Sequence, residues 1–145
     1  MSNFKQFKFK EVDWSSEADS IMSIRRIVFA LEQRFDEKMV YDRHDPYCHH
    51  ILVLDSIDQP VACGRLNQDG RIGRIAVLMS HRGRGIGTYL LSELIKIARH
   101  SHIPTLSLNA ETDLSHFYDQ QKFCADGPVY MKQGIPYQRM VKRLG

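Results

Sequence analysis

The stretch that decides the fold is Arg74-Ile-Ala-Val-Leu-Met-Ser-His-Arg-Gly-Arg-Gly-Ile-Gly-Thr88. Its apolar start predicts a strand and its glycines predict a turn. The spacing of the apolar residues after the turn predicts an amphipathic helix over 87–100. Glycines let the backbone turn sharply and approach a ligand, so successive N–H groups can point at one anion. The helix adds the positive end of its dipole, and Arg82 and Arg84 add mobile charge. The stretch therefore predicts a cradle for a pyrophosphate.

Two common phosphate motifs do not fit this stretch. A dinucleotide-binding fingerprint needs G-x-G-x-x-G after the first strand and an acidic residue about 20 positions later. Here the spacing is G-x-G-x-G in mid-chain, and residues 105–108 contain no acid. A P-loop needs G-K-S/T, which this chain lacks. An ordinary strand-to-helix turn is the remaining alternative, but it does not require three glycines and two arginines in the six residues 82–87.

The rest of the chain predicts one α/β domain over residues 1–145, with a mixed sheet flanked by helices. The expected order is β-α-β-β-β-α-β-α-β-β. Strands are expected at 4–12, 50–55, 60–66, 71–78, 104–109, 123–132 and 137–143. A first helix capped by Ser15 or Ser16 should end near Gln33, with Ile21, Ile24, Val28 and Leu31 on its buried face. Thr112 or Asp113 should cap a short third helix, and residues 34–49 should form a long loop or a broken helix.

Composition narrows the class of protein. Hydrophobic residues make up 43% and charged residues 26%, as in a globular domain. The net charge of +3 is mild and no run of basic residues occurs, so we expect neither a nucleic-acid nor a membrane surface. The N-terminus has no signal-peptide apolar block, which predicts a cytoplasmic protein. Three cysteines without a C-x-x-C pair, and His49-His50 pointing to opposite faces of a strand, predict neither a disulfide framework nor a metal site.

Several segments together resemble one enzyme family. Arg82-x-x-Gly85-x-Gly87 resembles the acyl-CoA signature R/Q-x-x-G-x-G/A of the GNAT acetyltransferases. Residues 26–33 resemble the first helix of the bacterial ElaA-like branch of this family, and residues 134–140 resemble its terminal hairpin. The family's N-x(7)-FY…GF element is similar to a set of residues in this chain, namely Asn109, Phe117-Tyr118 and Phe123. Lys122 stands where the family usually has glycine.

The resemblance implies a GNAT acyl-CoA N-acyltransferase fold and an enzyme that uses acetyl-CoA as co-substrate, without a metal. Strand 74–78 would carry a bulge and diverge from strand 105–109, so that the pantetheine arm lies between them. The residues implied to bind CoA are Ile75, Ala76 and Val77 through their backbones, Arg82, Gly83, Arg84, Gly85, Ile86, Gly87 and Thr88 at the pyrophosphate, and Asn109 and Tyr118 along the pantetheine.

The resemblance also implies catalytic roles. Tyr118 would protonate the departing CoA thiolate, since a phenol with a pKa near 10 is a usable donor to a thiolate with a pKa near 8.5. From spacing alone, Tyr118 could equally be a core aromatic residue. The attacking amine must lose its proton, and Glu32 is the first candidate for the base, with Asp42, Asp45 and His50 nearby in sequence. A glutamate in a helix can equally be a solvated residue.

The expected reaction is direct transfer of an acetyl group from acetyl-CoA to a primary amine in a ternary complex. The acceptor is open: a small-molecule amine and a protein or peptide amine both fit, and the chain could form a homodimer. Two alternatives use the same glycine turn. One is a non-catalytic acyl-CoA sensor, which would not need Tyr118. The other is a phosphopeptide- or nucleotide-binding module.

Overall fold

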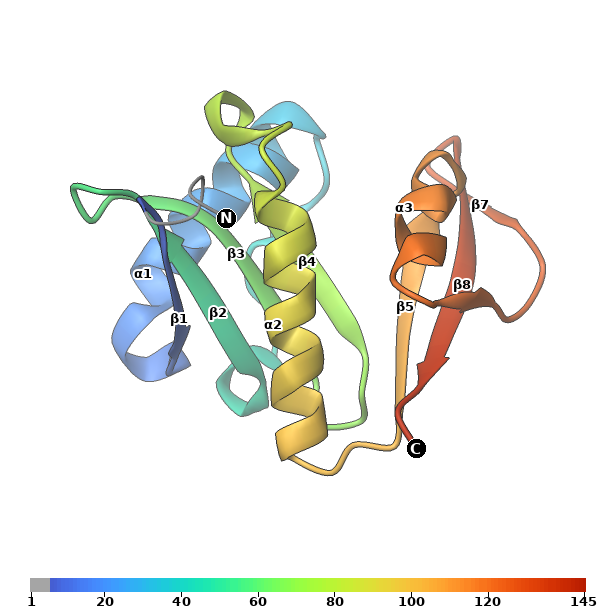
Figure 1. The fold of residues 1–145 in the computed structure, drawn as a ribbon. Helices are drawn as coiled ribbons and strands as arrows, with labels where there is room; N and C mark the ends of the chain where they lie inside the picture. The colour runs from blue at the N-terminus through green and yellow to red at the C-terminus, as the bar shows by residue number, and fades with distance from the viewer. Residues whose placement is uncertain (1–5) are drawn as a thin grey trace.

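The structure is a computed structural model that describes residues 6–145. It contains two antiparallel sheets, with a long helix on each face of the first sheet and a short helix beside the second (Figure 1). The expected α/β class and the order of the large elements are confirmed. Residues 4 and 5 of the expected first strand lie outside the described residues.

The first sheet carries the N-terminal half of the chain. Its strands lie in the spatial order β1 (Lys8–Val12), β2 (His49–Leu54), β3 (Pro60–Leu66) and β4 (Ile72–Val77), and all neighbours are antiparallel. The β2–β3 turn is fixed by Asp55, whose Oδ1 accepts the N–H groups of Ile57 and Gln59 at 3.0 and 2.9 Å. Short turns of this kind keep consecutive strands adjacent.

The first helix changes its winding halfway along. An α-helix, α1 (Trp14–Arg25), continues as a π-helix, η2 (Arg26–Glu32), and ends at Gln33 as expected. The N-cap is Asp13, so the assignment of the cap to Ser15 or Ser16 was wrong. Hydrogen bonds in a π-helix run from i to i+5, which widens the turn. Leu31 therefore leaves the expected apolar face and is 70% exposed, while Ile21, Ile24 and Val28 are buried.

The second long helix, α2 (Ile86–His100), covers the other face of the first sheet (Figure 1). Leu90, Leu91 and Leu94 are fully buried, and each burial contributes roughly 1.5–3 kcal/mol. The helix lies close to β3 because residue 64 is glycine: a Cβ there would stand 2.5 Å from the Cδ2 atom of Leu90. This packing fixes the start of α2, and with it the glycine turn, against the end of β4.

The second sheet is built around β8 (Ile135–Arg143). It pairs with β5 (Thr105–Glu111) on one side and with the short strands β6 (Cys124–Ala125) and β7 (Tyr130–Lys132) on the other. The single strand expected over 123–132 was wrong. Gly127, at φ +132°, and Pro128, which lacks an N–H group, interrupt it. The third helix, α3 (Ser115–Gln120), follows β5 through the 3-10 turn η6 (Thr112–Leu114). Its N-cap is Leu114, so the assignment of the cap to Thr112 or Asp113 was wrong.

The polar segment 34–49 forms two 3-10 turns, η3 (Glu37–Met39) and η4 (Asp45–Tyr47), and a further one, η5 (Met79–His81), precedes the glycine turn. The segment is thus a loop with short helical turns, as expected. Among the helices of residues 6–145, none combines the length and apolar character needed to span a bilayer.

Candidate active site

The glycine turn has the backbone geometry of an anion cradle. Gly83 and Gly85 have φ values of +76° and +82°, a region that side chains with a Cβ avoid. Gly85 is the N-cap of α2, and the hydrogen bond that opens the helix joins the Tyr89 N–H to the Gly85 carbonyl at 3.1 Å. The N–H groups before Tyr89 are therefore not used by the helix and point out of its positive end.

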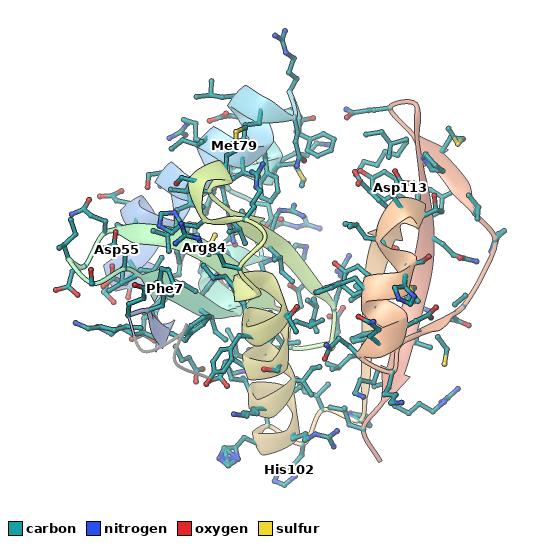
Figure 2. The ribbon with its side chains drawn as sticks, turned by 45° about the horizontal axis from the view of Figure 1, so that its top comes forward. Phe7, Asp55, Met79, Arg84, His102 and Asp113 are labelled. Atoms are coloured by element: carbon teal, nitrogen blue, oxygen red, sulfur yellow. The ribbon has the colours of Figure 1, made fainter. Side chains whose placement is uncertain are left out.

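The arginines of the turn differ in their surroundings. Arg84 is exposed at the start of α2 (Figure 2). Arg82 is held: its Nε donates to the Val77 carbonyl at 2.8 Å, and its Nη2 lies 2.6 Å from Oε1 of Glu32. The Leu78 N–H donates to β3 at Val61, so the Val77 carbonyl points away from β3. Arg82 therefore occupies the Val77 carbonyl, a backbone acceptor that the family resemblance implies for pantetheine.

Strand β4 carries the expected bulge. Cys63 on β3 pairs with Ala76 and Arg65 with Gly73, so β4 has one more residue than β3 between these pairs. The extra residue brings Arg74 to φ +52°. Strand β5 lies next to the start of β4: Ser107 of β5 forms a parallel bridge with Arg71, the residue before β4. From there the two sheets diverge (Figure 1).

Two pockets line this divergence. One, of about 330 Å³, is formed by Val77, most of the glycine turn and Phe117. The other, also about 330 Å³, is lined by the β4 bulge at Gly73 and Arg74, by Asn109 on β5, and by Tyr130 and Tyr137 on the terminal hairpin. Both pockets touch β4, the first at Val77 and the second at Ile72, Gly73 and Arg74.

Tyr118 is held by a helix C-terminal motif that uses lysine in place of glycine. The Phe123 N–H donates to the Tyr118 carbonyl at 3.1 Å, and the Lys122 N–H donates to Asp119 at 2.9 Å, which is a Schellman motif. Lys122 takes the left-handed position at φ +70°. The rings of Tyr118 and Phe123 are 6.1 Å apart, so the substitution of the usual glycine leaves the motif intact.

Tyr118 is partly buried, and within residues 6–145 its hydroxyl has no hydrogen-bond partner. Burial raises its pKa above 10, and the carboxylate of Glu111 adds to the increase. The phenol is therefore protonated at neutral pH. Its ring contacts Phe117, which lines the cradle pocket, at a centroid distance of 4.9 Å.

The predicted bases lie in two different places. Glu32 is at the cradle, paired with Arg82. Asp42 lies in the second pocket, while Asp45 and His50 are fully buried beneath it. Burial lowers the pKa of His50, and its Nε2 lies 2.8 Å from the Asp45 carbonyl oxygen, which holds it as a neutral ring in the core. His50 and Asp45 therefore have no access to a substrate.

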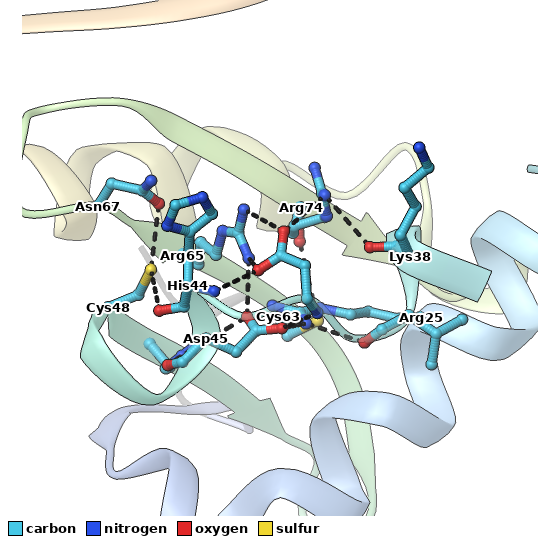
Figure 3. Close-up of polar contacts among 12 residues, drawn as sticks. Arg25, Lys38, His44, Asp45, Cys48, Cys63, Arg65, Asn67 and Arg74 are labelled. Atoms are coloured by element: carbon cyan, nitrogen blue, oxygen red, sulfur yellow. Dashed lines mark hydrogen bonds and ion pairs between the residues drawn. The ribbon is translucent and has the colours of Figure 1, made fainter. Parts of the chain in front are cut away.

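A buried ionic cluster, formed by Arg25, Asp42, Asp45, Arg65 and Arg74, lies under the second pocket (Figure 3). Arg25 is fully buried and donates to Asp45 at 3.0 Å. Arg65 binds both oxygens of Asp42, at 2.8 and 2.9 Å. Burial alone would raise the pKa of Asp42, but the hydrogen bonds and charge of Arg65 lower it from 3.8 to about 2. Asp42 is therefore a poor base at neutral pH.

Two site residues were missed from the sequence. The sequence indicated no role for Arg74 beyond its place in the strand. In the structure Arg74 lies at the bulge and lines the second pocket, and the strand pattern of the sequence does not show which residue the bulge turns toward a pocket. Glu111 follows Asn109 by two residues on β5, so both lie on the same face. Its charge raises the pKa of both Tyr118 and Tyr137. The expected strand ended at Asn109, whereas β5 ends at Glu111. Because side chains of a strand alternate between its two faces, the longer strand would have placed Glu111 on the same face as Asn109.

No set of three or more His, Cys, Asp or Glu side chains in the described part of the chain is arranged to hold a metal ion. The three cysteines are free thiols, and burial raises the pKa of Cys63 to about 11. These residues add no chemistry to the two pockets.

Comparison with known proteins agrees with this geometry. The family model described as the acetyltransferase (GNAT) domain matches residues 25–144. The uncharacterized N-acetyltransferase YjcF of Bacillus subtilis is 31% identical over 123 residues, covering 82% of this chain and 87% of YjcF. The crystal structure of Escherichia coli ElaA superposes with a TM-score of 0.86 at 25% identity, covering 94% of this chain and 99% of ElaA.

A structure with the cofactor bound shares the fold. The GNAT acetyltransferase of Elizabethkingia anophelis, solved with acetyl-CoA, has a TM-score of 0.73 at 16% identity and covers 97% of this chain and 99% of its own. At this identity the likeness extends to the fold alone.

Proposed function

Because this chain belongs to the GNAT acetyltransferases, which transfer acyl groups from acyl-CoA, we propose that it acetylates a primary amine by direct attack in a ternary complex. The observation that carries the proposal is the pair of pockets along β4, one at Val77 and the other at its beginning. One is rich in glycine and fits a cofactor with a pyrophosphate. The other is separate from it, which leaves room for a second substrate at the same time.

The cradle side would hold CoA through the turn. The N–H groups from Gly83 to Thr88 would bind the pyrophosphate, with Arg82 and Arg84 as counter-charges. The backbones of Ile75, Ala76 and Val77 and the amide of Asn109 would bind the pantetheine between the sheets. For this, Arg82 must leave the Val77 carbonyl, and a pyrophosphate is the kind of anion that would draw it away from Glu32.

Starting from an ammonium, the chemistry requires three proton transfers. The ammonium first loses one proton, at a cost of about 4–5 kcal/mol for a lysine-like amine at neutral pH, and Glu32 would take it once Arg82 has turned to the cofactor. The neutral amine nitrogen then forms a bond with the thioester carbon, the carbon–sulfur bond breaks, and Tyr118 gives its phenolic proton to the departing thiolate. The cationic nitrogen loses its second proton to solvent, and solvent returns a proton to the Tyr118 phenolate. Glu111, on the same face of β5 as Asn109, is a second carboxylate in reach of the divergence.

The test is release of free thiol from acetyl-CoA in the presence of a panel of amines. We expect thiol release to depend on the amine. Double-reciprocal plots of the initial rate against one substrate, at several fixed concentrations of the other, should give intersecting lines. Parallel lines would instead indicate a covalent acyl-enzyme and refute direct attack. Tight binding of acetyl-CoA without thiol release for any amine would favour the non-catalytic sensor.

A further inference from the structure

The second pocket is unusually basic for a site that must admit an amine. Four cationic side chains line it, and among the described residues Asp42 is the one carboxylate in its lining: the cations are Arg65, Arg71, Arg74 and Lys132. A protonated amine without a compensating charge would be repelled from such a surface. The pocket's charge therefore constrains what the acceptor carries besides its amine.

Asp42 compensates only one of these charges, and both its oxygens are already bound within the cluster. Its Oδ1 accepts from Arg65 at 2.8 Å and from the His44 N–H at 2.9 Å. Its Oδ2 accepts from Arg65 at 2.9 Å and from Arg74 at 3.0 Å. Asp45, beneath the pocket, is shared between Arg25 and Arg65. Three arginines of the buried cluster thus face two carboxylates, and one positive charge remains.

Arg74 is where that charge reaches the pocket. Its Nη2 is bound to Asp42 and to the Lys38 carbonyl, but its Nε is buried and has no partner within residues 6–145 (Figure 3). A buried guanidinium N–H without an acceptor is costly. The left-handed backbone of Arg74 at the β4 bulge holds this side chain in the pocket wall. The Arg74 side chain as a whole is 21% exposed and lines the pocket, so its charge is available to a ligand there.

Two further cations lie in the same lining with little compensation. Arg71 has a loose ion pair with Asp69, at 3.6 Å, and its side chain is half exposed. Lys132, on β7, is exposed, and no carboxylate of the described residues pairs with it. The same lining contains Tyr130 and Tyr137, whose rings are stacked with a centroid distance of 6.0 Å and provide an apolar wall for a short hydrocarbon.

We propose that the acceptor is a small amine that also carries a carboxylate, and that Arg71, Arg74 and Lys132 bind this carboxylate. This inference rests on the proposed acetyl transfer. The amine would face the β4–β5 divergence, where Asn109 and the bulge meet the thioester, and the carboxylate would face the arginines. Polyamines are excluded as preferred acceptors by the same charges.

The test compares ω-amino acids with their carboxamides, for example 4-aminobutyrate and 6-aminohexanoate. In these pairs the remote amine keeps nearly the same basicity, so the difference reports the carboxylate alone. We expect kcat/KM to be at least about tenfold higher for the acids. Diamines of equal length serve as the cationic comparison and should be the poorest substrates.

The variants Arg71→Gln and Lys132→Gln remove one pocket charge each at exposed positions, where folding is not at risk. Each should raise KM for the acid about threefold to tenfold while changing kcat, the KM for acetyl-CoA and the kinetics of the carboxamide little. Lys10→Gln, which removes the same charge from the exposed side of β1, should change none of these values.

Acetyl transfer and the carboxylate-bearing acceptor are refuted by different results. If carboxamides and diamines were acetylated as fast as the acids, acetyl transfer would stand and the carboxylate acceptor would be refuted. An acid preference that survived both variants would refute the assignment of the binding residues. If no amine released thiol, the proposed function would be refuted, and this inference with it.

Discussion

Replacing Tyr118 with phenylalanine should lower kcat about 10- to 100-fold and leave the fold unchanged. The ring contacts with Phe117 and Phe123 are retained, and the hydroxyl has no protein partner in the described chain, so no hydrogen bond is lost. The free energy of unfolding should therefore change by no more than about 0.5 kcal/mol. The lost function is the proton for the thiolate, and a thiolate is a tolerable leaving group, which places the loss at the low end for a general acid.

The pH dependence gives this variant a signature of its own. Burial raises the pKa of Tyr118 above 10, with a second contribution from Glu111, so the proton-donating form persists through neutral pH. The activity that depends on it should fall as pH rises through this raised pKa. In Tyr118→Phe this alkaline fall should disappear from the kcat profile, because the titrating group is gone.

The assay is kcat at several pH values for both proteins, with the affinity for CoA measured by calorimetry. Tyr41→Phe, which removes a hydroxyl from the ring stacked on Trp14 outside both pockets, is the matched control and should resemble the unaltered protein. Equal kcat across pH in Tyr118→Phe would reduce Tyr118 to a core aromatic residue. A large loss of CoA affinity would instead assign the hydroxyl to cofactor binding.

Three further outcomes follow from the geometry. Lys122→Gly should stabilise the fold by about 0.5–1 kcal/mol in thermal unfolding, since glycine accepts φ +70° without strain; Gln121→Gly, at φ −90°, should not. The ionised Asp42, with its pKa lowered to about 2, contributes roughly 2 kcal/mol that is fully present above pH 4 and lost as pH falls toward 2. Asp42→Asn should flatten that part of the stability–pH curve, and an unchanged slope would contradict the pairing with Arg65. Acetyl-CoA at about 100 times its Kd should add about 2.7 kcal/mol to the free energy of unfolding. NAD and ATP should add far less, and an equal effect of ATP would contradict a pantetheine site.

The regular elements of the first sheet were predictable from local pattern. The apolar spacing of α2, the turn at Asp55 and the glycines before Ile86 act over a few residues, and the structure has each of them. The π-helix was not predictable in this way. In this π-helix the buried Phe29 contacts the ring of Phe35 at a centroid distance of 6.5 Å, and Leu31, expected on the apolar face, is exposed.

The second pocket was the least predictable part of the site. Its floor joins Arg25, Asp42, Arg65 and Arg74 from four separate segments, and only the folded chain brings them together. Asp42 and Asp45 were expected near the acceptor as candidate bases, and their arginine partners turn them into structural groups instead. The turn at 83–88, by contrast, is one contiguous segment, so its backbone geometry could be inferred from residue order alone.

The central claim is that this turn binds the pyrophosphate of CoA, and calorimetric titration of CoA into Gly85→Val tests it most directly. Valine cannot readily adopt φ +82° and its side chain would stand where the backbone must approach the anion, so the Kd should rise at least about tenfold. Gly134→Val imposes a similar strain, at φ +78°, in the β7–β8 turn, and should cost stability while leaving the Kd unchanged. An unchanged Kd in a folded Gly85→Val protein would contradict the account.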